Sequence, residues 1–258
     1  MAKKRKIGVM IESFRLGVKD GIRKAAELGA DGFQIYVTRG EMAPENMDKG
    51  ARAAFRHFVA DQGLVISALC ADYGKGFLNP ETNAEYVEKT KRCMDLAVDL
   101  GTGIITTHIG HVPGDQNDPK WKIGIAALTE LAQYGDRVGV CFATETGPES
   151  ADLLKVFLQQ IDAKGARVNY DPANLCMYGF DPLGGVAVLK DYIAHTHAKD
   201  GKKGVLKEMP LGEGDVNLPA WVAELDAIGY DGFLTIEREV GDNPVADITK
   251  AISYLRTL

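Results

Sequence analysis

Short apolar runs alternate with longer amphipathic stretches along the whole chain. Between the apolar runs, apolar residues recur every three or four positions, as in residues 84–100 and 150–161, which is the spacing of a helix with one buried face. An apolar run followed by a helical pattern, repeated eight times, predicts an α/β fold, a (β/α)8 TIM barrel with parallel strands in a closed inner ring. The predicted strands cover residues 6–13, 32–37, 64–70, 103–109, 139–145, 166–171, 192–198 and 232–238.

Glycines punctuate this pattern between each predicted helix and the strand that follows it, where a residue that tolerates positive φ ends a helix. These glycines are Gly29, Gly63, Gly101, Gly139, Gly165 and Gly229. A doubly wound open sheet would show the same alternation, but no GxGxxG motif follows the first predicted strand. No linker interrupts the pattern, so we expect residues 1–258 to form one barrel domain.

The composition narrows the class of protein. The chain has 258 residues, a formal net charge of −6 and 26% charged residues, with basic residues scattered among acidic ones, so we expect no nucleic-acid partner. The opening MAKKRK precedes an apolar stretch that ends at Glu12, too short for a signal peptide, and we expect a cytoplasmic protein without a membrane partner. The four cysteines form no CxxC pair and lie in apolar segments, which predicts buried, reduced thiols.

Polar residues at the ends of four consecutive predicted strands suggest the chemistry. The fifth strand ends in ATETG, the sixth in NYDPAN, the seventh in HTHAKD and the eighth in TIERE, so each offers one residue: Glu145, Asp171, His197 and Glu237. Carboxyl ends of barrel strands meet at one face, where three carboxylates would repel one another unless a cation joins them. Three carboxylates and one imidazole form a mostly hard ligand set. We therefore predict one divalent ion, Mn²⁺ or Mg²⁺, with Co²⁺ or Zn²⁺ as alternatives.

The seventh predicted strand carries more than one basic group. Side chains alternate along a strand, so His195, His197 and Lys199 project to the same face. His197 is the predicted ligand, and we expect His195, one pleat deeper, to form hydrogen bonds within the barrel. Lys199 has two open interpretations: a cation directed at a substrate hydroxyl or phosphate, or a lysine on a solvated loop.

These motifs resemble the sugar phosphate isomerase/epimerase superfamily, which has the xylose isomerase-like TIM barrel. The resemblance covers essentially the whole chain and includes PLGEGDVNL at 210–218, which is similar to the loop before the seventh barrel helix. Ketose 3-epimerases of this superfamily hold their metal on a Glu, Asp, His, Glu quartet at corresponding strand ends. The resemblance therefore implies the same quartet here.

The resemblance implies proton transfer next to the carbonyl of a sugar or sugar phosphate, through an enediolate-like intermediate and with a metal ion as Lewis acid. Glu145 and Glu237 would be the catalytic pair on opposite faces of the substrate. One base acting alone would give aldose–ketose isomerisation, and the sequence does not separate the two outcomes. Homodimers or homotetramers are expected by analogy.

Further substrate contacts are predicted at His108, Asn174 and Lys199. His108 ends the fourth predicted strand, whereas His111 lies further into the loop and could simply be exposed. Asn174 replaces a histidine found in many related epimerases and endonucleases, and an asparagine binds a sugar hydroxyl better than a transition metal, which favours one metal over three. Glu12 could face the pocket or the surface.

Three other functions share features of this sequence. A metal-dependent lyase or dehydratase acting on a keto-inositol or keto-glycoside would begin with the same proton abstraction, so the quartet does not separate it. An apurinic endonuclease would need more histidine ligands and a basic groove, whereas this acidic chain has five histidines. A barrel that binds its ligand without turnover is disfavoured by the intact quartet.

Overall fold

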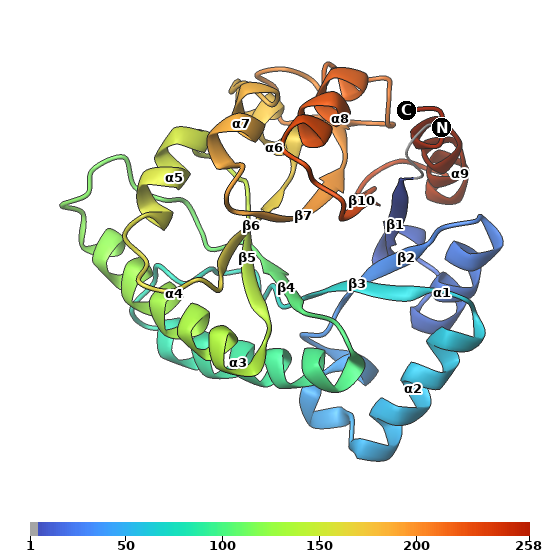
Figure 1. Cartoon of the computed structure of the whole chain (residues 1–258), viewed down its shortest axis with the longest axis horizontal. Helices are drawn as coiled ribbons and strands as arrows, with labels where there is room; N and C mark the ends of the chain where they lie inside the picture. The colour runs from blue at the N-terminus through green and yellow to red at the C-terminus, as the bar shows by residue number, and fades with distance from the viewer. Residues whose placement is uncertain (1–4) are drawn as a thin grey trace.

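The fold is an eight-stranded closed barrel surrounded by helices (Figure 1). The computed structural model describes residues 5–258, so the first four residues of the MAKKRK segment lie outside the described residues. Neighbouring strands follow the order β1-β10-β7-β6-β5-β4-β3-β2, and every pair around the ring is parallel. This confirms the predicted (β/α)8 barrel. The barrel strands are β1 (Lys6–Met10), β2 (Gly32–Tyr36), β3 (Val65–Cys70), β4 (Ile104–Thr107), β5 (Cys141–Glu145), β6 (Ala166–Tyr170), β7 (Ile193–Ala198) and β10 (Phe233–Ile236).

Each barrel strand is followed by helix, as the amphipathic pattern predicted. Two helices lie between β6 and β7, and three short 3₁₀ helices lie in the first loops: η1 (Ile11–Phe14), η2 (Gly40–Met42) and η3 (Pro44–Asn46). Side-chain caps fix several helix starts; Ser150, for example, accepts a hydrogen bond from Leu153 N at the start of α5. The α-helices are α1 (Val18–Glu27), α2 (Lys49–Asp61), α3 (Asn83–Leu100), α4 (Pro119–Val138), α5 (Ala151–Leu158), α6 (Pro172–Met177), α7 (Gly184–Leu189), α8 (Leu218–Ala227) and α9 (Pro244–Leu255).

The apolar core lies between the strand ring and the helices, whereas polar side chains lie inside the ring beneath its carboxyl end. Trp121 of α4 and Trp221 of α8 are buried in the core cluster. Five fully or almost fully buried polar residues form hydrogen bonds inside the barrel: Gln34 with Thr106, and Asn169 and Thr235 with His195. His197 links these two groups, because its Nε2 lies 2.9 Å from Gln34 Oε1 and 3.2 Å from Asn169 Nδ2. Because buried polar groups need partners, this network is one unit, and it supports the strand ends from below.

The junction glycines follow the prediction with one exception. Five of the six have positive φ, such as Gly139 at 78°, which follows α4. Gly165 does not have positive φ, so its predicted role as a left-handed helix end is wrong. A Cβ at this position would lie 2.5 Å from the carbonyl oxygen of Ala132 in α4, so Gly165 allows a close approach between α4 and the chain entering β6.

Two loop segments differ from simple strand-to-helix connections. The first predicted strand, 6–13, is shorter than expected, because β1 ends at Met10 and η1 carries Glu12. After β7, the strands β8 (Asp200–Gly201) and β9 (Glu208–Met209) form a small antiparallel pair within the loop that leads to α8, the seventh barrel helix.

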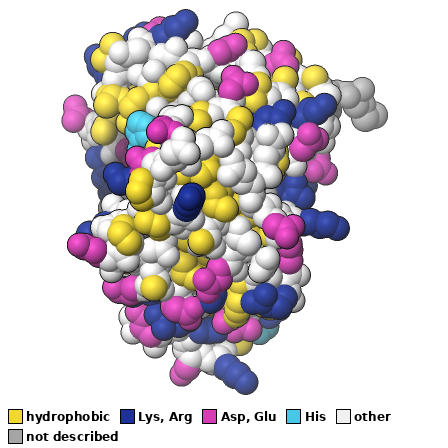
Figure 2. Space-filling model, turned by 90° about the vertical axis from the view of Figure 1, so that its left-hand side faces the viewer, with side chains coloured by type: hydrophobic (Ala, Val, Ile, Leu, Met, Phe, Trp, Pro, Cys, Tyr) yellow, Lys and Arg dark blue, Asp and Glu magenta, His cyan; other side chains and the backbone are white. Residues whose placement is uncertain are grey.

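The remaining predictions from composition concern thiols and surface. None of the four cysteines is in a disulfide; three are buried, and Cys141 is partly buried. No helix among residues 5–258 is long and apolar enough to cross a membrane. The face drawn in Figure 2 carries acidic and basic side chains interspersed with apolar ones.

Candidate metal centre

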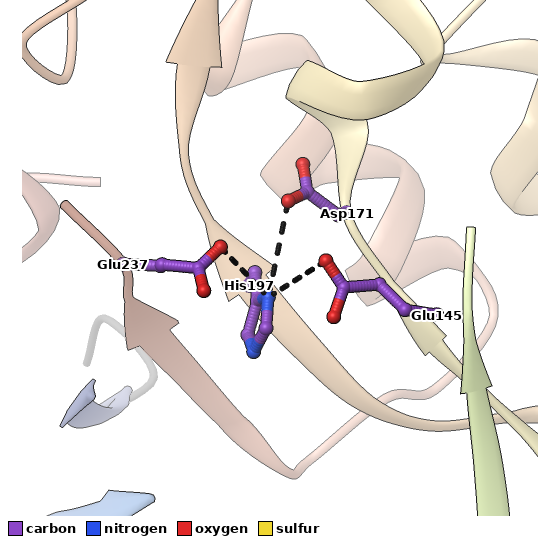
Figure 3. Close-up of side chains that lie close together, drawn as sticks. All are labelled: Glu145, Asp171, His197 and Glu237. Carbon is purple, nitrogen blue, oxygen red and sulfur yellow. Dashed lines mark ion pairs between the residues drawn. The ribbon is translucent and has the colours of Figure 1, made fainter. Parts of the chain in front are cut away.

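Four buried side chains from neighbouring strands converge at the carboxyl end of the barrel (Figure 3). Glu145 is the last residue of β5, Asp171 follows β6, His197 lies in β7 and Glu237 follows β10. One ligand atom of each lies within 4.8 Å of the others. His197 Nδ1 is at the centre, 3.4 Å from Glu145 Oε1, 3.8 Å from Asp171 Oδ2 and 3.3 Å from Glu237 Oε2. The structure thus brings the four predicted residues together.

The orientation of the His197 ring is set by Gln34, a fully buried residue of β2. His197 Nε2 lies 2.9 Å from Gln34 Oε1, and Gln34 Nε2 donates to Thr106 Oγ1 at 2.8 Å. An amide oxygen only accepts hydrogen bonds, so this contact, which is shorter than the 3.2 Å between Asn169 Nδ2 and the same nitrogen, assigns the hydrogen to Nε2. In the neutral ring, Nδ1 therefore carries the lone pair, and it is directed at three carboxylates. The Nδ1 lone pair and the three carboxylates are all electron-pair donors directed at one point, so together they could bind a cation.

The electrostatics of the quartet favour a positive charge at its centre. Burial lowers the tendency of His197 to be charged, but Glu145 and Glu237 outweigh it and raise the pKa of the imidazole well above its usual value. Burial opposes ionisation of Glu145 and Glu237 as well, yet the charges of neighbouring cations hold the pKa of both carboxyls below the usual value. Burial dominates at Asp171, whose pKa is raised. A divalent cation in place of the His197 proton would satisfy all four residues.

Asp171 provides the most direct sign that a ligand belongs here. Its Oδ1 caps α6 by accepting hydrogen bonds from the backbone N–H groups of Ala173 and Asn174, at 2.7 and 3.0 Å. Its Oδ2 is buried and finds no hydrogen-bond donor among the described residues. An orphaned carboxylate oxygen is costly to bury and is a natural metal ligand. The donor set, three carboxylates and one imidazole nitrogen, therefore fits the predicted divalent ion.

Lys199, directly after β7, is buried and ion-paired. Its Nζ donates to Glu237 Oε2 at 2.9 Å and to Glu239 Oε2 at 2.6 Å, and it lies 3.9 Å from Asp171 Oδ2. The alternative of a solvated loop lysine is therefore wrong. Carboxylates therefore surround two of the three basic groups of the seventh strand, His197 and Lys199.

His108 lies beside the quartet, as its position after β4 suggested. Its Nδ1 is 2.8 Å from Asp72 Oδ2 at the end of β3, and its Nε2 is 3.5 Å from Glu145 Oε1. The charge of Glu145 is the main reason that the pKa of His108 is raised to about 10. About half of the side chain is exposed, so His108 lines the mouth of the barrel and is accessible to a ligand.

Asn174 lies against Glu145. Its Nδ2 donates to Glu145 Oε1 at 3.0 Å and to the backbone carbonyl of Thr146 at 3.1 Å, while Asn169 Nδ2 donates to Glu145 Oε2 at 3.2 Å. The two asparagines hold both oxygens of the Glu145 carboxylate in place. Any contact of Asn174 with a substrate would fall to its Oδ1.

The residues whose roles the sequence left open are now placed. His195 is buried, with Nδ1 2.8 Å from Asn169 Oδ1 and Nε2 3.0 Å from Thr235 Oγ1, which confirms the expected hydrogen bonds within the barrel. His111 is exposed. Glu12 faces a cavity that Glu237 also lines, and its Oε1 accepts a hydrogen bond from Tyr36 N.

Three residues of the site were not predicted from the sequence. Asp72 could have been found by the strand-end rule, because it follows the third predicted strand, as Glu145 ends the fifth. Gln34 and Asn169 gave a weaker signal, a single polar residue inside an otherwise apolar strand.

Comparison with known proteins agrees with this geometry. The profile of the xylose isomerase-like TIM barrel family matches residues 22–258. The chain belongs to this family. A relative of this chain is the L-ribulose-5-phosphate 3-epimerase UlaE of Salmonella paratyphi C, 25% identical over 91% of this chain and 87% of its own.

Solved structures superpose closely on this barrel. A xylose isomerase domain protein from Planctomyces limnophilus has a TM-score of 0.86 at 25% identity, covering 100% of this chain and 97% of its own. The 3-keto-D-glucoside 4-epimerase YcjR from E. coli has a TM-score of 0.82 at 18% identity, covering 99% of this chain and all of its own, which supports the shared fold alone.

Proposed function

We propose that this chain is a divalent-metal-dependent isomerase or epimerase of a sugar or sugar phosphate. The observation that carries the proposal is the position of Glu145 and Glu237, which lie on opposite sides of His197 with ligand atoms within 4.8 Å of each other (Figure 3). The relationship to an L-ribulose-5-phosphate 3-epimerase supports the same reaction class. Assembly as a homodimer or homotetramer and a cytoplasmic location stay predictions.

The residues that would hold the metal are Glu145, Asp171, His197 and Glu237. When bound, the ion would supply a Lewis acid next to the carbonyl of an open-chain sugar; Mn²⁺ is our first choice, and Mg²⁺, Co²⁺ and Zn²⁺ are alternatives.

The two glutamates supply the proton transfers in this proposal. Neighbouring cations keep both carboxyls ionised, so either can accept the proton on the carbon next to the carbonyl. For epimerisation, one glutamate removes that proton from one face, and the other, after taking up a proton from solvent, donates it from the opposite face, so the configuration at that carbon is inverted. For isomerisation, one glutamate returns the proton to the neighbouring carbon.

The surrounding residues position these groups. Asn169 and Asn174 fix the Glu145 carboxylate from both sides, and Lys199 bridges Glu237 and Glu239. Glu237 and Glu239 accept two of the three N–H donors of Lys199, which leaves one donor for the predicted contact with substrate. His108 offers a partly exposed N–H at the mouth of the barrel for a substrate hydroxyl.

The test combines metal analysis with isotope exchange. The purified protein should hold about one divalent ion per chain, and incubation with a ketose panel in deuterated water should place deuterium on the carbon next to the carbonyl. Glu145→Gln and Glu237→Gln should each lower turnover by about 10²-fold or more while the circular dichroism spectrum is unchanged. Glu224→Gln, at an exposed position of α8, is the matched control. Full activity in both active-site variants would refute the assignment, and loss of water or of an aglycone from the product would indicate a lyase.

A further inference from the structure

A cavity opens beside Glu237 on the side of the barrel away from Glu145 and Asp171. Its walls come from the ends of β1, β2 and β10, and its volume is about 230 Å³. A second cavity of about 430 Å³, formed by the loops after β2 and β3, shares Tyr36 and Arg39 with the first. Together they are in the size range of small-molecule pockets, about 300–1,000 Å³. Since Glu237 also belongs to the quartet, a sugar held there would extend into this space.

The carboxylates that line the first cavity already have partners. Glu237 and Glu239 both accept hydrogen bonds from Lys199 Nζ, at 2.9 and 2.6 Å. Glu12 Oε1 accepts a hydrogen bond from Tyr36 N at 3.1 Å. Burial raises the pKa of Glu12, and the charge of Arg39 offsets this only in part. All three carboxylates of this wall are therefore already held by donors of the chain.

The arginines that line the same cavity differ in how many hydrogen bonds and ion pairs they form with the chain. Arg238 forms two ion pairs, with Glu208 at 2.6 Å and with Asp247 at 2.8 Å. Arg15 donates to the backbone carbonyls of Glu239 and Gly241, both at 2.9 Å, so its guanidinium is positioned by neutral acceptors.

Arg39 is the least engaged of these arginines. It is exposed, and within residues 5–258 it makes no hydrogen bond and no ion pair. It lines both cavities, directly beyond β2, so its guanidinium is free to reach a ligand in either one. A planar guanidinium with five donors suits the bidentate binding of a phosphate group.

We propose that Arg39, assisted by the charge of Arg15, binds a phosphate monoester at the end of the substrate remote from the quartet. The proposal rests on the proposed function, because it places the reacting carbons at Glu145 and Glu237, and it narrows the substrate class to phosphorylated ketoses. Arg39 is a specificity-determining residue in this scheme, since it contacts the substrate away from the reacting atoms.

The test compares matched phosphorylated and free sugars on the Mn²⁺-loaded protein. L-ribulose 5-phosphate with L-ribulose, and D-fructose 6-phosphate with D-fructose, are the two probe pairs. Dissociation constants are measured by calorimetry, and deuterium exchange is followed separately. The variants are Arg39→Gln, the conservative Arg39→Lys, and the control Arg137→Gln, an exposed arginine in the last turn of α4.

The expected result is tighter binding of at least one phosphate ester than of its free sugar. Arg39→Gln should weaken the phosphate ester about tenfold or more and leave the free sugar within about twofold, and Arg39→Lys should recover part of the loss. Arg137→Gln should bind as the wild type does. The proposal is overturned if no phosphate ester binds more tightly than its free sugar, or if Arg39→Gln weakens both equally or neither.

The two readouts separate this proposal from the proposed function. Selective binding that depends on Arg39, without deuterium exchange on any ketose, would keep the phosphate site and refute the isomerase reaction. Exchange on free ketoses, with no preference for phosphate esters, would keep the reaction and refute the phosphate site.

Discussion

Replacing Gln34 with methionine should weaken metal binding without touching any predicted ligand. Gln34 is fully buried, and it holds His197 by accepting the Nε2 hydrogen at 2.9 Å. Methionine has similar length and volume but offers no amide oxygen. The imidazole would keep its place in β7 and lose the contact that directs Nδ1 toward the carboxylates.

Two magnitudes follow from these contacts. Thr106 also donates to the carbonyl of Leu69, so its hydroxyl keeps a partner, and the group left unpaired is the buried His197 N–H. One such group costs about 1–3 kcal/mol in the free energy of unfolding of the metal-free protein. Removing a partner that orients a histidine ligand typically lowers metal affinity about 10- to 100-fold, which corresponds to about 1.4–2.7 kcal/mol.

The assay measures both quantities on the same variant. Mn²⁺ affinity is determined by titration against a competing chelator, and stability by urea unfolding of the chelator-treated protein. Gln133→Met, at an exposed position of α4, is the matched control and should change neither value appreciably. If Gln34→Met is less stable but binds Mn²⁺ within about twofold of the wild type, Gln34 is only a packing residue and the argument for an oriented Nδ1 is refuted.

Two further predictions concern buried ionisable groups outside the quartet. Arg238→Ala leaves the buried Glu208 carboxylate without its guanidinium partner. This substitution should lower the free energy of unfolding of the chelator-treated protein by about 3–5 kcal/mol, and a decrease below about 1 kcal/mol would contradict the prediction. Burial raises the pKa of Glu149 from its ordinary value of 4.5 to about 7, so the unfolded chain ionises this carboxyl first and stability is lost as pH rises through this interval. The free energy of unfolding of the wild type, measured with urea, should fall by about 3 kcal/mol more than that of Glu149→Gln between pH 4.5 and 7. If the two proteins have parallel pH profiles, Glu149 is not a buried neutral carboxyl.

The fold and the convergence of the quartet were predictable because both follow from simple periodicities. Alternating apolar runs and amphipathic helices specify parallel strands, and parallel strands in a closed ring place their carboxyl ends together. Four polar residues at consecutive strand ends must then meet, as Glu145, Asp171, His197 and Glu237 do. Their roles as ligands and bases stay predictions, because proximity does not identify the ion or the substrate.

The residues that position the quartet depend on strand pairing, which the pattern of one strand does not contain. Along β2 and β3, Phe33 pairs with Ile66 but Gln34 pairs with Ala68, and the register of β6 and β7 shifts in the same way between Val168 and Asn169. Each shift skips one residue of the neighbouring strand and decides which side chains lie opposite each other. After the shift between β6 and β7, Asn169 pairs with His195 and forms a hydrogen bond with it. After the shift between β2 and β3, the Gln34 side chain lies inside the barrel and forms a hydrogen bond with His197 on the other side of the ring.

Bulges beside functional sites commonly redirect side chains, and here both shifts occur at residues that hold a histidine. A polar residue in an apolar strand was therefore the only trace of Gln34 and Asn169 in the sequence, and it does not say which way the side chain points. The ligands lie where strands end, a position that sequence periodicity defines. The residues that orient the ligands lie within strands, where one extra residue in the neighbouring strand changes the contacts of every residue that follows. The sequence therefore predicts the ligands better than the residues that orient them.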